Sequence, residues 1–170
     1  MSLRDRTGEK PDLYRRSNEA DSSSGHLLVP FAALDAALAA RSGNGEIGVE
    51  IDNTVKADAL TPYLDRLGLI AIAFPTFADG RGFSIAKTLR NRGYRGALRA
   101  VGPLIADQFA YALACGFDEV ELPQAVAARQ PVAQWIAALG RMRGAYQRSH
   151  PTLGASILDQ RRAARRARPE

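Results

Sequence analysis

The run Leu-Ile-Ala-Ile-Ala-Phe at residues 69–74 is followed by Pro-Thr-Phe-Ala-Asp-Gly-Arg-Gly-Phe-Ser at residues 75–84. A short, continuous apolar run of this kind is typical of a strand that is covered on both faces of a sheet. The two glycines and the polar residues after it indicate a loop that leads into a helix. A buried strand followed by a loop and a helix predicts a parallel sheet.

Weaker runs of the same kind occur on both sides of this strand. They predict further strands at residues 27–29, 46–52, 97–102 and 119–122. Between them, apolar residues at helical spacing predict helices within residues 60–67, 85–89, 105–113 and 132–147. We therefore predict an α/β fold, a single domain of repeated β-α units with a mostly parallel sheet. The sheet is either an open doubly wound sheet or a partial β/α barrel, because four or five strands are too few to close an eight-stranded barrel.

Composition divides the chain into three parts. Residues 1–25 are polar and are expected to be a mobile leader, residues 26–150 an α/β domain, and residues 151–170 a basic tail with five arginines. The tail carries much of the net charge of +5. Its charge favours contact with nucleic acid, but no aromatic residues lie between the arginines to stack on bases. Nucleic acid is therefore not an expected partner.

Several classes of protein are excluded. The single cysteine, Cys115, allows no internal disulfide and no iron–sulfur cluster held by several thiolates of one chain. No apolar segment approaches the roughly 18 residues of a membrane helix, and charges alternate where a secretory signal would be apolar. We expect a cytoplasmic protein with no membrane contact. His26 and His150 lie far apart in the sequence, so no metal site is expected, and no complete cofactor motif is present.

The loop after the strand at 69–74 is the richest in chemistry. Parallel sheets place ligand sites at the carboxyl ends of their strands, and Gly80 and Gly82 permit backbone conformations that turn N–H groups toward an anion. The predicted anion site combines this loop with two arginines and a serine. Its residues are Gly80, Arg81, Gly82, Ser84 and Arg99. The ligand would carry a phosphate, sulfate, sulfite or carboxylate group. The alternative is a tight turn in which Asp79 and Arg81 pair with neighbouring residues and stabilise the loop.

Acidic and amide side chains near this loop have two interpretations each. Asp79 and Glu121 are candidates for an acid/base pair, or they form salt bridges to Arg99 or Arg95. Asp107 and Gln108 fall in the first turn of a predicted helix, where such residues cap the helix or support an anion-binding arginine. Cys115 has apolar neighbours and is expected to be a buried structural thiol.

The order of these motifs carries a resemblance. FPTFADGRGFS at residues 74–84, LRAVG at 98–102, Asp107-Gln108 and CGFD at 115–118 resemble an uncharacterised bacterial family, domain of unknown function 934. The close match covers residues 68–122. This chain departs from the family pattern at Pro103, where the family usually has an acidic residue, and at Ala114, where it often has an arginine.

The resemblance implies a small cytoplasmic protein of the kind encoded beside assimilatory sulfite reductase. We therefore expect an accessory protein of assimilatory sulfate/sulfite reduction, with sulfite reductase or another sulfur-assimilation protein as partner. The alternative is a small enzyme that binds a phosphate-, sulfate- or carboxylate-bearing substrate at the carboxyl ends of the strands. An open edge strand would also allow a homodimer.

Overall fold

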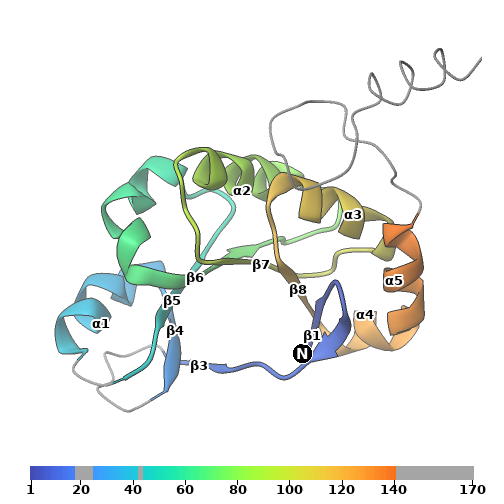
Figure 1. The fold of residues 1–170 in the computed structure, drawn as a ribbon, viewed down its shortest axis with the longest axis horizontal. Helices are drawn as coiled ribbons and strands as arrows, with labels where there is room; N and C mark the ends of the chain where they lie inside the picture. The colour runs from blue at the N-terminus through green and yellow to red at the C-terminus, as the bar shows by residue number, and fades with distance from the viewer. Residues whose placement is uncertain (18–24, 42–43, 141–170) are drawn as a thin grey trace, which may run out of the picture.

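In the computed structural model, residues 1–17, 25–41 and 44–140 are described, and eight strands among them form one curled sheet (Figure 1). The strand order is β2-β1-β8-β7-β6-β5-β4-β3. The strands are β1 (Ser2–Asp5), β2 (Gly8–Lys10), β3 (Tyr14–Arg16), β4 (His26–Pro30), β5 (Ile47–Ile51), β6 (Leu67–Ala73), β7 (Ala97–Val101) and β8 (Glu119–Leu122). The predicted basic tail, residues 151–170, lies outside the described residues.

The sheet is mostly parallel. Strands β3 to β8 pair in parallel, whereas β1 pairs antiparallel with both β8 and β2. The predicted α/β class and parallel sheet are therefore confirmed. Of the two forms that the sequence left open, the sheet adopts the curled one and resembles half of a barrel in cross-section (Figure 1).

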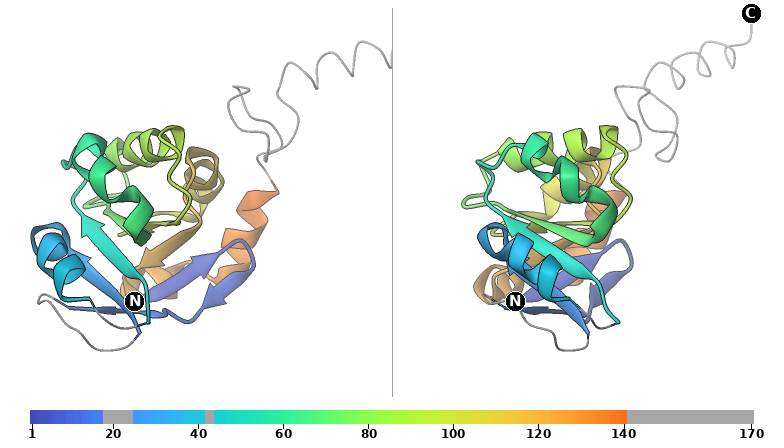
Figure 2. Two further views of the ribbon diagram at one scale, coloured as in Figure 1. Left: turned by 60° about the vertical axis from the view of Figure 1, so that its left-hand side comes forward. Right: turned by 90° about the vertical axis from the view of Figure 1, so that its left-hand side faces the viewer.

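The helices pack on the outer, convex face of the curled sheet (Figures 1 and 2). The α-helices are α1 (Leu34–Ala40), α2 (Arg81–Asn91), α3 (Ala106–Cys115), α4 (Gln124–Arg129) and α5 (Val132–Leu139). Two further segments, η1 (Phe31–Ala33) and η2 (Ala57–Arg66), are 3₁₀ helices. Between this layer and the sheet lies the main apolar core, which includes Ile70, Ile72 and Phe109, none more than 2% exposed.

Several helical segments differ from the predictions. The segment predicted as an α-helix at residues 60–67 is the 3₁₀ helix η2, which contains Pro62, a residue that cannot donate a backbone hydrogen bond. Segments η1, α1 and α4 were not predicted, because their three, seven and six residues are too few to show an apolar stripe. The predicted helix at 132–147 is present as α5 up to Leu139, and residues 141–147 lie outside the described part.

Residues 1–25 differ most from expectation. We predicted a mobile leader, but residues 2–16 supply strands β1, β2 and β3. Arg4 explains how β1 is held: it is 3% exposed, and its guanidinium donates to the carbonyls of Gln130 and Ala127 at 2.7 and 3.2 Å. The same guanidinium lies over the ring of Trp135, 5.4 Å from its centroid. The polar composition of this segment reflects buried ion pairs and hydrogen bonds.

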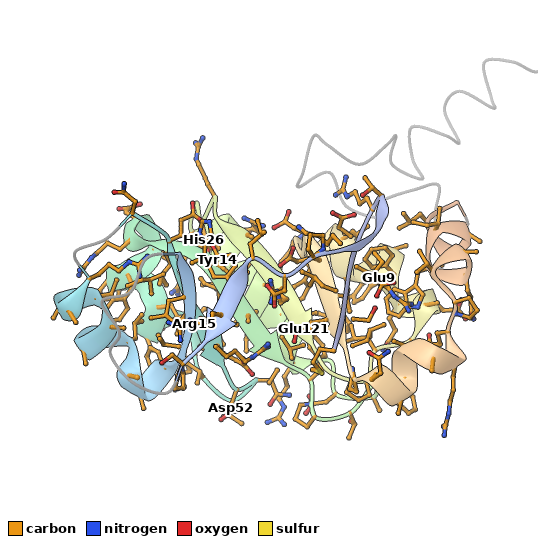
Figure 3. All side chains as sticks on the ribbon, turned by 90° about the horizontal axis from the view of Figure 1, so that it is seen from below. Glu9, Tyr14, Arg15, His26, Asp52 and Glu121 are labelled. Carbon is orange, nitrogen blue, oxygen red and sulfur yellow. The ribbon has the colours of Figure 1, made fainter. Side chains whose placement is uncertain are left out.

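The connection between β2 and β3 accounts for the curl. These strands are consecutive in the chain but lie at opposite edges of the eight-stranded sheet. Residues 11–13 join them, and four Cα steps can span at most about 14 Å. In a flat sheet the two edges would be about 34 Å apart. The edges must therefore approach each other, and the connection crosses the open side of the sheet (Figure 3).

Candidate functional site

The inner, concave face of the sheet holds a cluster of charged side chains around Arg99. Because side chains alternate along a strand, Arg99 of β7 and the two glutamates of β8 point to this face, away from the helices. All three are buried: Arg99 and Glu121 are 1% exposed and Glu119 is 5% exposed. Burying charged groups is costly unless each is paired, so this face requires an internal network of partners.

Three carboxylates surround the Arg99 guanidinium. Its Nε donates to Glu119 at 2.7 Å, and its Nη1 donates to Glu121 at 3.0 Å. Asp12, from the connection between β2 and β3, accepts from both Nη1 and Nη2 at 2.8 Å. Burial alone would lower the pKa of Arg99, but the hydrogen bonds to Asp12 and Glu119 and the negative charges of these two residues together outweigh burial and raise this pKa. Arg99 is thus permanently charged.

Two further cations complete the network from the N-terminal strands. Lys10 of β2 pairs with Glu119 at 2.8 Å. Arg16 of β3 pairs with Glu121 at 2.8 Å and with Glu50 at 2.9 Å. The second oxygen of Glu121, Oε1, is buried and has no hydrogen-bond partner. Strands β2 and β3 were not predicted from the sequence. They supply the cations that pair with Glu119 and Glu121 of β8.

This network bears on two of the sequence predictions. Arg99 was expected to bind an external anion, but its guanidinium is engaged by three protein carboxylates. Glu121 was a candidate for acid/base work with Asp79, yet its partners are Arg99 and Arg16, whereas Asp79 pairs with Arg81. The structure therefore does not join Arg99 to the predicted loop, and it does not pair Asp79 with Glu121.

The loop between β6 and α2 holds a close ion pair. Arg81 is 60% exposed, and its Nε and Nη2 donate to Asp79 at 3.0 and 2.6 Å. The backbone N–H of Arg81 also donates to Asp79 at 3.2 Å. The hydrogen bond from Arg81 is the main reason that the pKa of Asp79 lies well below its usual range. A strongly ionised Asp79 is a poor proton donor at neutral pH.

The glycines of this loop have ordinary backbone angles. Gly80 precedes the helix with φ near −80°, and neither Gly80 nor Gly82 has a positive φ, so the loop does not use the backbone conformations that only glycine readily adopts. Gly82 is explained by packing, because a Cβ at this position would collide with the ring of Phe74. Ser84 is exposed on the first turn of α2, and its carbonyl accepts from Thr88 at 2.8 Å.

Gln108 connects helix α3 to this loop. Its Nε2 donates to the carbonyl of Phe77 at 2.7 Å, and its Oε1 accepts from the backbone N–H of Ile105 at 3.2 Å. The second contact caps the helix, as one of the two interpretations predicted. The first contact fixes the loop before Asp79 and involves no arginine, which the other interpretation required. Asp107 lies beside it in the first turn of α3.

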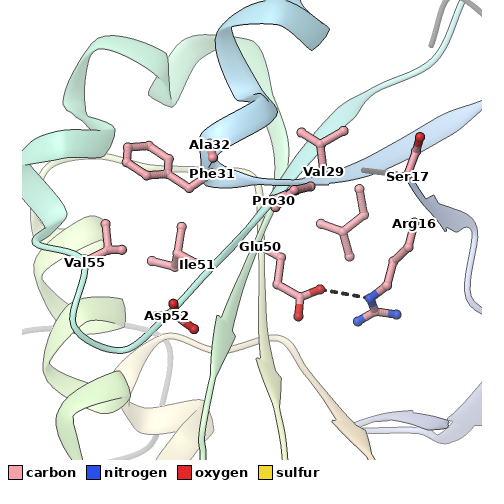
Figure 4. Close-up of a pocket in the computed structure, with 11 residues that line it drawn as sticks. Arg16, Ser17, Val29, Pro30, Phe31, Ala32, Glu50, Ile51, Asp52 and Val55 are labelled. Atoms are coloured by element: carbon pink, nitrogen blue, oxygen red, sulfur yellow. Dashed lines mark hydrogen bonds and ion pairs between the residues drawn. The ribbon is translucent and has the colours of Figure 1, made fainter. Parts of the chain in front are cut away.

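A pocket lies at the carboxyl ends of β3, β4 and β5, and sequence reasoning did not predict it (Figure 4). Its volume is about 510 Å³, within the range of small-molecule sites. Arg16, Glu50 and Asp52 are its charged residues. The remaining lining residues are Ser17, Leu28, Val29, Pro30, Phe31, Ala32, Ile51 and Val55. Asn53 follows Asp52 in the chain and is 5% exposed, and its side chain hydrogen-bonds to Asp79, which helps to lower the pKa of that carboxyl.

One signal in the sequence pointed to the missing partners. The predicted strands at 97–102 and 119–122 carry Arg99, Glu119 and Glu121, and buried charges of both signs require counterions. The sequence therefore indicated that counterions were needed. No pattern in residues 1–17 indicated that Lys10, Asp12 and Arg16 would supply them. Their separation from β7 and β8 is about 100 residues, beyond any local pattern.

Residues 1–17, 25–41 and 44–140 contain neither a membrane-spanning helix nor a metal-binding group of side chains. No helix there is long and apolar enough to cross a membrane. No group of three or more histidine, cysteine, aspartate or glutamate side chains there is arranged to hold a metal ion. Cys115 is buried, and burial raises the pKa of its thiol.

Comparison with known proteins gives one match. Residues 48–154 match the family described as "Bacterial protein of unknown function (DUF934)". This range includes β5 to β8, the loop with Asp79 and Arg81, and Arg99. It excludes β1, β2 and β3, and with them Lys10, Asp12 and Arg16. A search of curated proteins found no match.

Proposed function

Because this chain belongs to the DUF934 family of bacterial proteins, we propose that it is a cytoplasmic accessory protein of assimilatory sulfate/sulfite reduction whose Asp79–Ser84 loop binds an anion. The association with sulfite reduction is supported by the gene neighbourhood that the family resemblance implies. Anion binding by the loop is supported by the Asp79–Arg81 ion pair, and this is the observation on which the proposal depends. An exposed arginine held by a carboxylate of its own loop is placed at the carboxyl edge of the sheet, where α/β proteins bind ligands.

The anion would take the place of Asp79 on Arg81. Sulfite and sulfate present the same paired oxygens as a carboxylate, so the guanidinium can exchange one for the other with little movement. Gln108 holds the backbone of the loop through Phe77 while this exchange occurs. Arg99 takes no part, because its release would leave three carboxylates with a missing counterion.

A role in binding is better supported than a role in catalysis. General acid/base work needs a side chain whose pKa lies near the working pH, and the pKa of Asp79 is shifted the other way. Glu121, the other candidate, is held inside the sheet by Arg99 and Arg16. A macromolecular partner, sulfite reductase or another sulfur-assimilation protein, would then receive the anion or respond to it. A homodimer through the edges is poorly supported, since the edge strands β2 and β3 are three residues long and charged.

A deletion strain tests the proposal directly. Growth is measured with sulfate, sulfite, sulfide or cysteine as the sole sulfur source, with complementation by the wild type, Arg81→Ala and Arg95→Ala. Failure on sulfate and sulfite with rescue by sulfide would support the proposed step. Loss of complementation by Arg81→Ala alone, with the protein folded, would assign the function to the loop. Normal growth on all four sources would contradict the sulfur proposal.

The position of Arg81 at the carboxyl edge of the sheet favours a second candidate function. The chain would then be a small enzyme that binds a phosphate-, sulfate- or carboxylate-bearing substrate at the carboxyl ends of the strands, with the anionic group of the substrate on Arg81. A deletion strain that grows normally on every sulfur source but accumulates one such metabolite would favour this function.

A further inference from the structure

The pocket at β3–β5 carries more negative than positive charge. Of the residues that line it, Glu50 and Asp52 are acidic and Arg16 is basic. The Glu50 carboxylate lies between Asp52 and the Arg16 guanidinium, and Asp52 is beside Ile51 and Val55 (Figure 4). Asp52 is exposed at the end of β5, where a ligand can reach it. The sign of this charge is opposite to the one that an anion site requires.

Arg16 does not reverse that sign. Its Nε is bound to Glu50 at 2.9 Å, and its Nη2 is bound to Glu121 at 2.8 Å. The hydrogen bond to Glu121 contributes most to raising the pKa of Arg16. An anion that entered the pocket would compete with two carboxylates for this guanidinium and would also meet Asp52. A cation would meet two carboxylates, of which only Glu50 already has a partner in the pocket.

The rest of the pocket is apolar. Phe31 and Ala32 of η1, Ile51 at the end of β5, and Val55 form the wall opposite Arg16 (Figure 4). Such a wall can cover a short hydrocarbon body. The combination of an apolar wall and a few convergent polar groups is typical of small-molecule sites.

We propose that this pocket binds a small organic cation, an amine or guanidinium attached to a short apolar body. The charged group lies between Asp52 and Glu50, and the body lies against Phe31 and Val55. This site is separate from the proposed anion loop, which follows β6, so the two proposals can fail independently. Arg16 would act as a positioning residue, because its bonds to Glu50 and Glu121 fix the Glu50 carboxylate at the pocket.

Three probes with one body and different charge test the proposal. Benzylamine, benzyl alcohol and benzoate are titrated into the full ¹⁵N-labelled chain, and amide chemical shifts are followed by NMR. Benzylamine should give saturable shifts at Ala32, Ile51 and Val55 in the millimolar range expected of so small a ligand. Benzyl alcohol should bind more weakly, and benzoate should give no saturable shift at these amides.

Two variants and a control identify the groups responsible. Asp52→Asn removes one carboxylate at an exposed position and should weaken benzylamine binding roughly tenfold. Ala32→Trp fills an exposed part of the pocket and should abolish binding of benzylamine and benzyl alcohol. Asp65→Asn makes the same charge change in η2 and should leave the affinity unchanged. Binding of benzoate at least as tight as that of benzylamine, or no saturable shift with benzylamine, would overturn the proposal.

Discussion

Asp12 binds both terminal nitrogens of Arg99, each at 2.8 Å, across 87 residues of sequence. This bidentate pair fastens the connection between β2 and β3 to the middle of the sheet. The arginine is 1% exposed, so the pair also provides part of the charge compensation that lets an arginine occupy the inner face. Asp12 belongs to a segment that the sequence alone predicted as a mobile leader.

Removal of Asp12 should destabilise the whole protein. Asp12→Ala leaves Arg99 with two carboxylates and without its bidentate partner, and loss of one member of such a pair leaves a poorly compensated buried charge. We expect the free energy of unfolding to fall by about 1–3 kcal/mol, measured by urea denaturation. Asp65→Ala, at an exposed site in η2, should change it by less than about 0.5 kcal/mol. Equal effects of the two variants would show that the Asp12 contact contributes little.

The same carboxylate should contribute to acid sensitivity. Burial raises the pKa of Asp12, but the hydrogen bonds from Arg99 and from the backbone N–H of Tyr14, together with the charges of Arg99 and Arg16, outweigh burial, and the pKa is lowered in the folded state. A lowered folded pKa stabilises the protein above the unfolded value of about 4, and this stabilisation is lost as the pH falls through the folded pKa. The wild type should therefore lose stability more steeply than Asp12→Asn below about pH 4. Parallel curves of unfolding free energy against pH would contradict this.

Replacement of Gly82 by alanine should destabilise the protein while Phe74 is present. Alanine normally favours a helix interior by about 1 kcal/mol over glycine, but here its Cβ would collide with the Phe74 ring. We expect Gly82→Ala to lower the free energy of unfolding by about 1–3 kcal/mol in urea denaturation. The double variant Phe74→Leu, Gly82→Ala should lose less than the sum of the single effects. Additive losses would mean that the two residues do not compete for the same space.

Asp79 should compete with external anions for Arg81. Asp79→Asn removes the competing charge, so the affinity for sulfite or sulfate should rise several-fold in calorimetric titration. Arg81→Ala should lower it roughly tenfold, and Arg95→Ala should leave it unchanged. An affinity that falls in Asp79→Asn would mean that Asp79 supports the anion site and does not compete with it.

Cys115 should react slowly in the folded protein. The thiol is buried, and burial raises its pKa, so little thiolate is present near neutral pH. A disulfide reagent should modify the unfolded chain in urea much faster than the native protein at the same pH. Equal rates would show that the helix around Cys115 opens readily.

Sequence patterns predicted the five strands whose residues are apolar enough to be recognised locally. Strand β6 shows this best, since its buried residues from Leu69 to Ile72 form one continuous apolar run. Strands β1, β2 and β3 have three or four residues each and owe their place to pairing with distant strands. Gly8-Glu9-Lys10 has no propensity for a strand, and its position follows from the antiparallel register with β1.

The candidate site was predicted in part for the same reason. The alternative interpretation of the loop expected Asp79 and Arg81 to pair with neighbouring residues, but it did not say that they pair with each other, as they do. The environment of Arg99 could not be predicted, because it depends on Asp12, which lies far away in the sequence. The pocket at β3–β5 could not be predicted either, since Arg16 enters it through a strand that showed no pattern.

The antiparallel pairing of β1 with β8 has a consequence for biosynthesis. One edge of β1 pairs with β2, which is made directly after it, but the other edge pairs with β8. Ser2 pairs with Leu122, so that edge meets its neighbour only after some 120 further residues have been made. At the usual pace of translation this takes on the order of ten seconds. During that time one edge of β1 stays unpaired, and Lys10 and Arg16 lack the β8 glutamates that pair with them in the folded protein. Closure of this part of the sheet is thus timed by the synthesis of its eighth strand.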